Sequence, residues 1–316
     1  MFTRVSVPTP FQVGAVNAYL AGRTVVDPGP DSEEAWSVLL EALEDEGLAP
    51  DDLARVVVTH PHPDHFGLAR RLQDAGATVA ASPDAARVMA DFPAQLEREQ
   101  TFFTDFFERC GMAQSTADTV TDLPEAFLSY APSVQTERDL TDGDQFEVAG
   151  QPVDVSAVEG HAIGERILAY DGETGREAVV GDNVLGDITP NPLLQPPASP
   201  GAERPRVLPA FNDSLDRLAE QPFERFLPGH REAIDAPQQR IAEIREAHEE
   251  RTENVLELVR DEGPITPVEV MEGLFGDLPA TEGFAGMSEA VGHLDVLEAR
   301  GEVTREERGG ILVFEA

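Results

Sequence analysis

The chain has 316 residues, about twice the roughly 150 residues of a typical domain, so we expect one large domain and a smaller second one. Hydrophobic residues make up 41% of it, which excludes a disordered chain, and no apolar run approaches the ~18 residues of a membrane span. Residues 1–4 begin no signal-peptide apolar region, so we expect a cytoplasmic protein without a membrane partner. Cys110, the only cysteine, excludes an internal disulfide framework.

The charge balance is strongly acidic. There are 60 Asp and Glu against 23 basic residues, all of them arginine, which gives a formal charge of -37. Such a surface repels itself in dilute buffer, but 1 M salt screens charges to a Debye length of roughly 3 Å. This pattern favours a halophilic cytoplasm over the alternative of an ordinary acidic protein encoded by a GC-rich genome.

Strands and helices alternate through the first part of the chain. Short strands are expected at 4–7, 15–20 and 24–27, followed by a helix that Asp31 or Ser32 caps and that ends near Glu46. The β-branched run 55–59 is typical of a strand buried on both faces. A helix at 67–75 and a strand at 77–81 continue the alternation, which predicts a layered α/β fold.

Residues 84–130 look mostly helical and interrupt this order as an insertion. Further strands and one helix are then expected in the order 145–148, 153–158, 166–170, 177–180, helix 214–219 and 223–227. After Pro237 the pattern predicts three helices and a pair of strands, with Thr266 as a helix cap before Pro267. This outline is typical of a winged-helix module. We therefore predict a larger domain at 1–236, with the insertion inside it, and a small winged-helix-like domain at 237–316.

Histidines are scarce, and three of the seven lie within six residues after the 55–59 strand: His60, His62 and His65, with Asp64 between the last two. Residues i and i+2 of an extended turn can converge on one cation. Imidazole and carboxylate groups at this density suit zinc or another borderline divalent metal.

Three further elements each end a strand or begin a turn, and they contain His161, Asp182 and His230. Together with Asp27 and the 60–65 cluster, they form five motifs in a recognisable order. On these residues, about 4–235 of the sequence resembles the metallo-β-lactamase fold superfamily. The resemblance implies an α/β fold, a four-layer αββα sandwich.

The resemblance also implies two metal sites that share one carboxylate. The first metal would be held by His60, His62 and His161; the second would be held by Asp64, His65 and His230; Asp182 would bridge the two. The ions would be zinc, with iron or manganese left open, and a hydroxide shared by both would be the nucleophile.

Three carboxylates would assist the chemistry. Asp27 matches a position that hydrogen-bonds a ligand or the metal-bound water, and Asp64 or Asp182 could pass a proton to the leaving group. We therefore expect a hydrolase acting on a small-molecule ester, thioester or lactone, similar to glyoxalase II. The residues 162–165, which replace the common Thr-Pro-Gly-His/Ser, and Arg231, which follows His230, depart from the superfamily pattern around the pocket.

Three alternatives stay open. The tail resembles that of the β-lactamase-like 2 hydrolases, some of which cleave single-stranded RNA, so an endoribonuclease is the main one. A mononuclear iron dioxygenase and a non-catalytic metal-binding protein are the others. Because residues 237–316 hold 7 Arg against 19 Asp and Glu, we favour packing on the catalytic domain or homodimerisation over nucleic acid as the role of the tail.

Two other groups need an interpretation. Residues Phe102, Phe103, Phe106 and Phe107 share one helical face. This face is either a local core, in which Cys110 is a buried thiol, or the wall of an acyl pocket. His248 and His293 lie on apolar-periodic helices, so we expect both to be structural.

Overall fold

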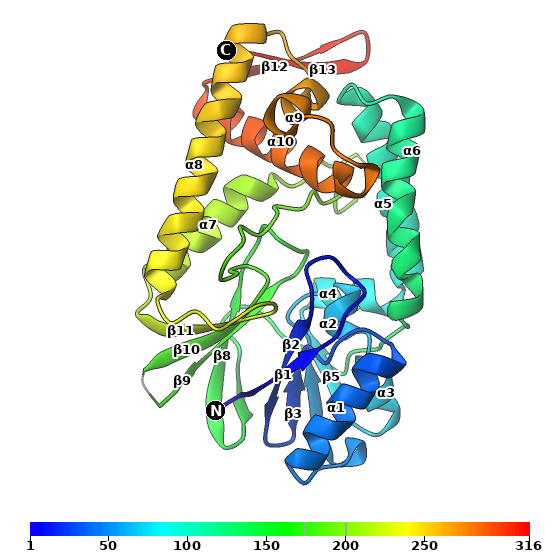
Figure 1. Cartoon of the computed structure of the whole chain (residues 1–316), viewed down its shortest axis with the longest axis vertical. Helices are drawn as coiled ribbons and strands as arrows, with labels where there is room; N and C mark the ends of the chain where they lie inside the picture. Colours follow the sequence, from blue (N-terminus) through cyan, green and yellow to red (C-terminus); the bar gives the residue numbers. More distant parts are fainter. Residues whose placement is uncertain (174, 200) are drawn as a thin grey trace. The chain divides into compact units, whose positions relative to one another are not determined.

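The computed structural model describes residues 1–173, 175–199 and 201–316 (Figure 1). These residues form two compact units, each assembled from three segments of the chain. Unit 1 is made of Met1–Pro93, Ala126–Pro190 and Arg217–Ile241, and unit 2 is made of Ala94–Glu125, Asn191–Asp216 and Ala242–Ala316.

Unit 1 contains two sheets. The first has six strands in chain order: β1 (Thr3–Val7), β2 (Val16–Ala21), β3 (Thr24–Val26), β4 (Arg55–Val57), β5 (Thr78–Ala81) and β6 (Arg138–Asp139). Pairing is antiparallel from β1 to β3 and parallel from β3 to β6. The second sheet has the order β11-β10-β9-β8-β7: β7 (Gln145–Val148), β8 (Gln151–Ala157), β9 (Arg166–Asp171), β10 (Arg176–Gly181) and β11 (Phe223–Pro228). In this sheet β10 and β11 pair in parallel, and the other neighbours pair antiparallel.

The core of unit 1 lies on both faces of the first sheet. Val56 and Val58 pack in one cluster with α1 (Glu33–Asp45) and α3 (Ala69–Asp74), whereas Val57 packs in a second cluster with residues of the other sheet. Adjacent side chains of a strand point to opposite faces, so this run is buried on both sides, as predicted. Burial of each valine contributes about 1.5–3 kcal/mol and fixes the strand end that precedes the histidine cluster.

Local signals set the start of the helices in unit 1. Ser32 caps α1, its hydroxyl accepting a hydrogen bond from Ala35 N at 3.1 Å, which confirms the predicted cap. Ser82 caps α4 (Pro83–Ala90) in the same way, with Pro83 in the first turn. Gly67 follows α2 (Pro63–Phe66), and a Cβ there would lie 2.2 Å from Asp31 N and 2.3 Å from Tyr130 O. Only glycine therefore fits this approach of two loops.

Unit 2 is largely helical. Its elements are α5 (Phe92–Arg109), α6 (Gln114–Asp122), α7 (Val207–Ala219), α8 (Pro237–Glu262), α9 (Pro267–Phe275), α10 (Ala280–Arg300) and the hairpin of β12 (Thr304–Arg308) and β13 (Ile311–Glu315), with parts of α5, α7 and α8 belonging to unit 1. Of the two 3-10 helices, Pro50–Asp52 lies in unit 1, and Leu123–Tyr130 is divided between the two units at residue 125. The predicted cap holds, since Thr266 and Glu269 form a capping box at α9. The order of three helices and a hairpin is present, and its winged-helix character stays a prediction.

The two units divide the chain differently from the predicted domains. The prediction left the whole insertion with residues 1–236, whereas Ala94–Glu125 and Asn191–Asp216 are parts of unit 2. The physical reason is the apolar face of α5. Phe103 and Phe107 pack against Phe284 of α10, with ring centroids 5.0 and 5.5 Å apart. The C-terminal helices therefore share one core with the insertion.

Among the described residues, no helix is both long enough and apolar enough to cross a bilayer.

Candidate metal centre

The turn after β4 places four chemically active side chains together. His65 N and Phe66 N both donate to His62 O, at 2.9 and 3.2 Å, so a helical turn begins at the His62 position. Pro63 in its first turn has no N–H to leave unsatisfied. His60 Nε2 lies 3.1 Å from His62 Nδ1, so these two rings converge as the i, i+2 spacing predicts.

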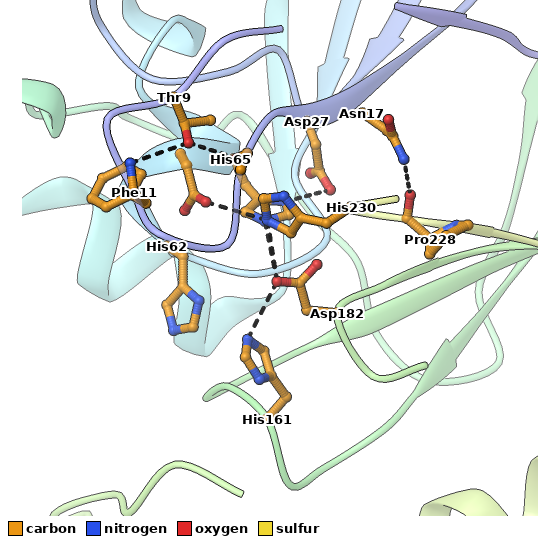
Figure 2. A network of polar contacts seen from close by, with 12 residues as sticks. Thr9, Phe11, Asn17, Asp27, His62, His65, His161, Asp182, Pro228 and His230 are labelled. Atoms are coloured by element: carbon orange, nitrogen blue, oxygen red, sulfur yellow. Dashed lines mark hydrogen bonds and ion pairs between the residues drawn. The ribbon is translucent and has the colours of Figure 1, made fainter. Parts of the chain in front are cut away.

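The other candidate ligands come from the ends of strands in the second sheet. His161 follows β8, Asp182 follows β10, and His230 follows β11. Figure 2 shows Asp182 between His161 on one side and His65 and His230 on the other. Its Oδ2 lies 3.6 Å from His65 Nε2, 3.6 Å from His161 Nε2 and 3.4 Å from His230 Nε2. One carboxylate oxygen thus faces three imidazoles.

Two sets of three candidate ligands flank this carboxylate, and a third, overlapping set joins Asp27 to His60 and His65. The ligand atoms of each set lie within 4.8 Å of one another, and the two flanking sets are His60, His62 and His161, and Asp64, His65 and His230. His230 Nε2 is also 3.3 Å from Asp64 Oδ2. The structure brings together every residue that the sequence proposes for the two metals, and ligation itself stays a prediction.

Asp27 orients its neighbours. Thr59 N and Thr59 Oγ1 donate to its two oxygens at 2.8 and 2.6 Å, and His65 Nδ1 lies 3.0 Å from Oδ2. Asp27 has a φ of 50°, a left-handed conformation that Asp tolerates better than most residues. These contacts match the expected supporting role of Asp27, which leaves His65 Nε2 for the shared centre.

Burial and charge set the protonation of the histidines. Burial, reinforced by neighbouring imidazoles, lowers the pKa of His62 to about 3 and that of His60 well below 6.5. Burial also lowers the pKa of His65, but Asp182, Asp64 and Asp27 outweigh it and hold that pKa well above 6.5. His60 and His62 are therefore held in the neutral form that binds metals.

The donor set fits divalent cations. His65 Nε2, His230 Nε2 and Asp182 Oδ1 are buried and have no hydrogen-bond partner among the described residues. Leaving a buried polar atom unsatisfied costs about 1–3 kcal/mol, and a bound cation would remove that cost. The other ring nitrogens of these two histidines are already fixed, since His65 Nδ1 lies 3.0 Å from Asp27 Oδ2 and His230 Nδ1 lies 2.8 Å from Ala15 O. Such contacts fix ring orientation in metal sites.

Sequence reasoning missed Glu165, a buried acid that contacts Asp182 and Asn183. Glu165 is fully buried and accepts hydrogen bonds from Asp182 N and Asn183 Nδ2, both at 3.1 Å. Burial raises the pKa of Glu165 to about 8, against the opposing effect of Asn183. The sequence marked 162–165 only as a departure from the superfamily pattern. A buried acidic residue has no sequence signal of its own in a chain that contains 60 Asp and Glu residues in all.

The remaining candidates lie in unit 2. Phe103, Phe107 and Cys110 are buried in its core, and burial raises the pKa of Cys110 to about 12, which confirms a local core on this part of the face. Phe106 belongs to the same core and Phe102 packs against it, and both also line a cavity of about 440 Å³ within unit 2.

The two other histidines are held by polar neighbours. His248 Nδ1 lies 2.8 Å from Asn212 Oδ1, and His293 Nδ1 lies 2.8 Å from Thr252 Oγ1. Both are buried in unit 2, as expected of structural residues.

Comparison with known proteins places the chain in a family. Residues 12–230 match the model of the metallo-beta-lactamase superfamily, which is more than half of the chain. The probable metallo-hydrolase YqjP of Bacillus subtilis is 30% identical over 319 residues, covering 98% of this chain and 96% of that protein.

Two solved structures agree along the whole chain. A metallo-beta-lactamase family protein from Thermus thermophilus has a TM-score of 0.81 and 27% identity, covering 99% of this chain and 98% of the other. A beta-lactamase domain protein from Burkholderia ambifaria has a TM-score of 0.77 and 25% identity, covering 100% and 91%. The chain belongs to the metallo-β-lactamase superfamily and has its αββα sandwich fold. Within that superfamily it is a metallo-hydrolase.

Proposed function

We propose that this protein is a dinuclear metal hydrolase that cleaves a small ester, thioester or lactone. The observation that carries the proposal is Asp182 Oδ2, which faces His65, His161 and His230 at 3.4–3.6 Å. A ligand shared by two ions must lie between the other ligands of both, and Asp182 lies between the two candidate sets. When bound, two divalent ions sharing a hydroxide would bring its pKa towards neutrality and polarise the substrate oxygen.

The protein residues then have distinct tasks. His60, His62 and His161 would hold one ion, and Asp64, His65 and His230 the other, with zinc as the expected metal and iron or manganese as alternatives. Asp27 keeps the His65 ring in place through the 3.0 Å contact at Nδ1. Asp64 and Asp182 are the carboxylates that can carry a proton to the leaving group. Cys110 is not available as a nucleophile, because it is buried in the core of unit 2 with a raised pKa.

The test is hydrolysis of acyl thioesters, aryl esters and lactones by the full chain, before and after chelation. We expect two metal ions per chain, loss of activity on chelation, and recovery when zinc is returned. Asp182→Ala should lower kcat/KM by about 100-fold or more, because it removes the shared ligand. Glu177→Gln is the control, since Glu177 is a buried carboxylate of β10 that accepts from Tyr170 Oη at 2.7 Å and lies outside both ligand sets. Activity that is unchanged after chelation, or full activity of Asp182→Ala, would refute the proposal.

Single-stranded RNA is the second candidate substrate. The observation in its favour is the order of three helices and a hairpin from α8 to β13. The 7 Arg against 19 Asp and Glu in residues 237–316 oppose it, because phosphate binding needs a basic face. Metal-dependent cleavage of unstructured RNA in concentrated salt, without hydrolysis of any acyl substrate, would establish it instead.

A further inference from the structure

Glu165 is a buried acid that touches the turn bearing the shared carboxylate. It has no exposed surface, and it lies in the loop between His161 and β9. An ionisable group in such a place costs free energy unless hydrogen bonds compensate for its lost hydration. Two donors do so, because Asp182 N donates to Oε1 and Asn183 Nδ2 donates to Oε2, each at 3.1 Å.

The backbone of Glu165 is fixed from both sides. Val158 N donates to Glu165 O at 3.2 Å, and the next residue, Arg166, donates through its N–H to Thr59 O at 2.9 Å. Thr59 in turn holds Asp27 and lies next to His60. The position of the Glu165 carboxylate, and through it that of Asp182, therefore depends on the histidine-bearing turn of the other sheet.

The end of β10 packs closely against the Glu165 side chain. Gly181 has a φ of 51°, and a Cβ there would lie 3.0 Å from both Glu165 Oε1 and Thr59 Oγ1. Glu165 and Thr59 thus both pack against Gly181, the residue that precedes Asp182 in the chain. A shift of the Glu165 oxygen would move the Asp182 N–H and, with it, the carboxylate that faces three imidazoles.

We propose that Glu165 is a positioning residue that fixes the Asp182 carboxylate between the two metal sites, through its hydrogen bond to the Asp182 N–H and through Asn183. The inference rests on the metal centre of the proposed function. It concerns a residue that departs from the superfamily's common Thr-Pro-Gly-His/Ser motif, so the role belongs to this chain's own sequence. The role depends on the length and hydrogen-bonding geometry of the side chain and not on its charge.

Substitutions at residue 165 separate geometry from charge. Glu165→Met keeps a side chain of similar length and removes both acceptors. Glu165→Asp keeps the carboxylate but shortens it by one methylene. Glu165→Gln keeps the length of the side chain and can bond to the same two residues. Its amide oxygen can accept from Asp182 N, and its amide NH2 can donate to Asn183 Oδ1, a buried atom without a hydrogen-bond partner in the described part of the chain. The required flip of Asn183 gives up the 3.4 Å contact of its Nδ2 to Glu159 O and turns Oδ1 toward that carbonyl.

The measurement is zinc affinity of the metal-free full chain, by competition with a chromophoric chelator, together with its metal-free melting temperature. We expect Glu165→Met to weaken zinc binding by about 10- to 100-fold, the usual effect of removing a partner of a metal ligand. Glu165→Asp should also weaken binding, whereas Glu165→Gln should stay close to wild type. Glu177→Met is the matched control on β10, and it should lower the melting temperature without changing zinc affinity.

The outcomes are distinguishable. If charge alone matters, the order reverses, with Glu165→Asp close to wild type and Glu165→Gln weak, and the inference is overturned. Equal affinities for wild type, Glu165→Met and Glu165→Asp also overturn it. If Glu165→Met does not fold, the order of the Asp and Gln variants still decides. Absence of zinc binding by the wild-type protein would instead overturn the metal centre itself.

Discussion

His65 Nδ1 lies 3.0 Å from Asp27 Oδ2, and the opposite nitrogen of the same ring lies 3.6 Å from Asp182 Oδ2. The imidazole is thus held between two carboxylates that follow strands of different sheets, Asp27 after β3 and Asp182 after β10. One carboxylate fixes the ring, and the other shares its metal-facing edge. The fold brings these three residues together from positions that span more than 150 residues of the chain.

Loss of the Asp27 charge should weaken metal binding at the second set. In Asp27→Asn, an NH2 group replaces one of the two carboxylate oxygens. Both oxygens are native acceptors, because Oδ1 accepts from Thr59 N and Oδ2 faces Thr59 Oγ1 and His65 Nδ1, so one set of contacts is lost. We expect zinc affinity to fall by about 10- to 100-fold, as for other partners of metal-binding histidines. Chelator competition measures the change. Asp31→Asn is the control, since Asp31 pairs with Arg71 outside the cluster and should have no effect; equal affinity of the two variants would contradict the role of Asp27.

A methyl group at residue 229 should disrupt the centre. A Cβ on Gly229 would lie 2.2 Å from Asp182 Oδ1 and 2.7 Å from His65 Cε1, so Gly229→Ala must displace both side chains. We expect kcat/KM to fall by about 100-fold, the effect of a displacement of about 1 Å at a reacting centre.

Gly186→Ala provides the matched control for this change. The nearest atom to its added Cβ would be 3.5 Å away, an ordinary contact. A substitution that creates no clash usually changes the free energy of unfolding by less than about 0.5 kcal/mol. The centre should therefore keep its geometry, and activity should stay within about twofold of wild type. Wild-type activity and metal content in Gly229→Ala would show that Asp182 and His65 are not needed where the structure places them.

The candidate metal ligands could be predicted from the sequence because histidine is rare in it. His60, His161 and His230 follow strands, where loops present side chains, and the folded chain places His161 and His230 beside Asp182. Glu165 could not be found in this way, since its role depends on two donors that follow β10. Acidic residues are too common in this chain for one of them to stand out.

The organisation of unit 2 was also beyond the sequence pattern. Helical periodicity placed the four phenylalanines on one face, and three of them, Phe103, Phe106 and Phe107, are buried in the core of unit 2. It could not identify their neighbour, because Phe284 lies far along the chain, and packing between distant helices leaves no periodic signal. The predicted domains therefore followed chain order, whereas the compact units follow the shared core.

Acid should destabilise the protein through His248. Burial lowers the pKa of this histidine to about 4, against the opposing effect of Glu289 and with help from His293 and Arg251. An unfolded histidine takes up its proton near pH 6.5, so between about pH 6.5 and 4 the unfolded chain binds more protons than the folded one. Stability is therefore complete above about pH 6.5 and falls as the pH drops, by up to about 3 kcal/mol from this group.

Urea unfolding at pH 7.5, 5.5 and 4.5 measures this effect. His248→Gln keeps a neutral donor for Asn212 but cannot titrate, so the loss of stability between pH 7.5 and 4.5 should be smaller than in the wild-type protein. The pKa of His293 is lowered in the same direction by burial, so part of the slope should remain. An unchanged slope in His248→Gln would mean that the pKa of His248 is the same in the folded and the unfolded chain, and would contradict the prediction.

Stability should rise with salt, and α1 shows why. Glu44 and Asp45 are exposed in the last turn of this helix, which contains no basic residue. Negative charges are unfavourable there, because they face the negative end of the helix dipole. With a formal charge of -37 on the whole chain, we expect the melting temperature to rise by about 5 °C or more between 0.1 and 2 M KCl, as the Debye length falls from about 10 Å to below about 3 Å.

A double variant separates charge screening from other effects of salt. Glu44→Gln with Asp45→Asn removes two of the unfavourable charges and changes the side-chain volumes little. It should raise the melting temperature at 0.1 M KCl and have almost no effect at 2 M, because screening has already weakened the repulsion there. An equal gain at both concentrations would mean that helix propensity, and not charge, limits α1. A melting temperature independent of salt in the wild-type protein would remove the physical basis for a halophilic surface.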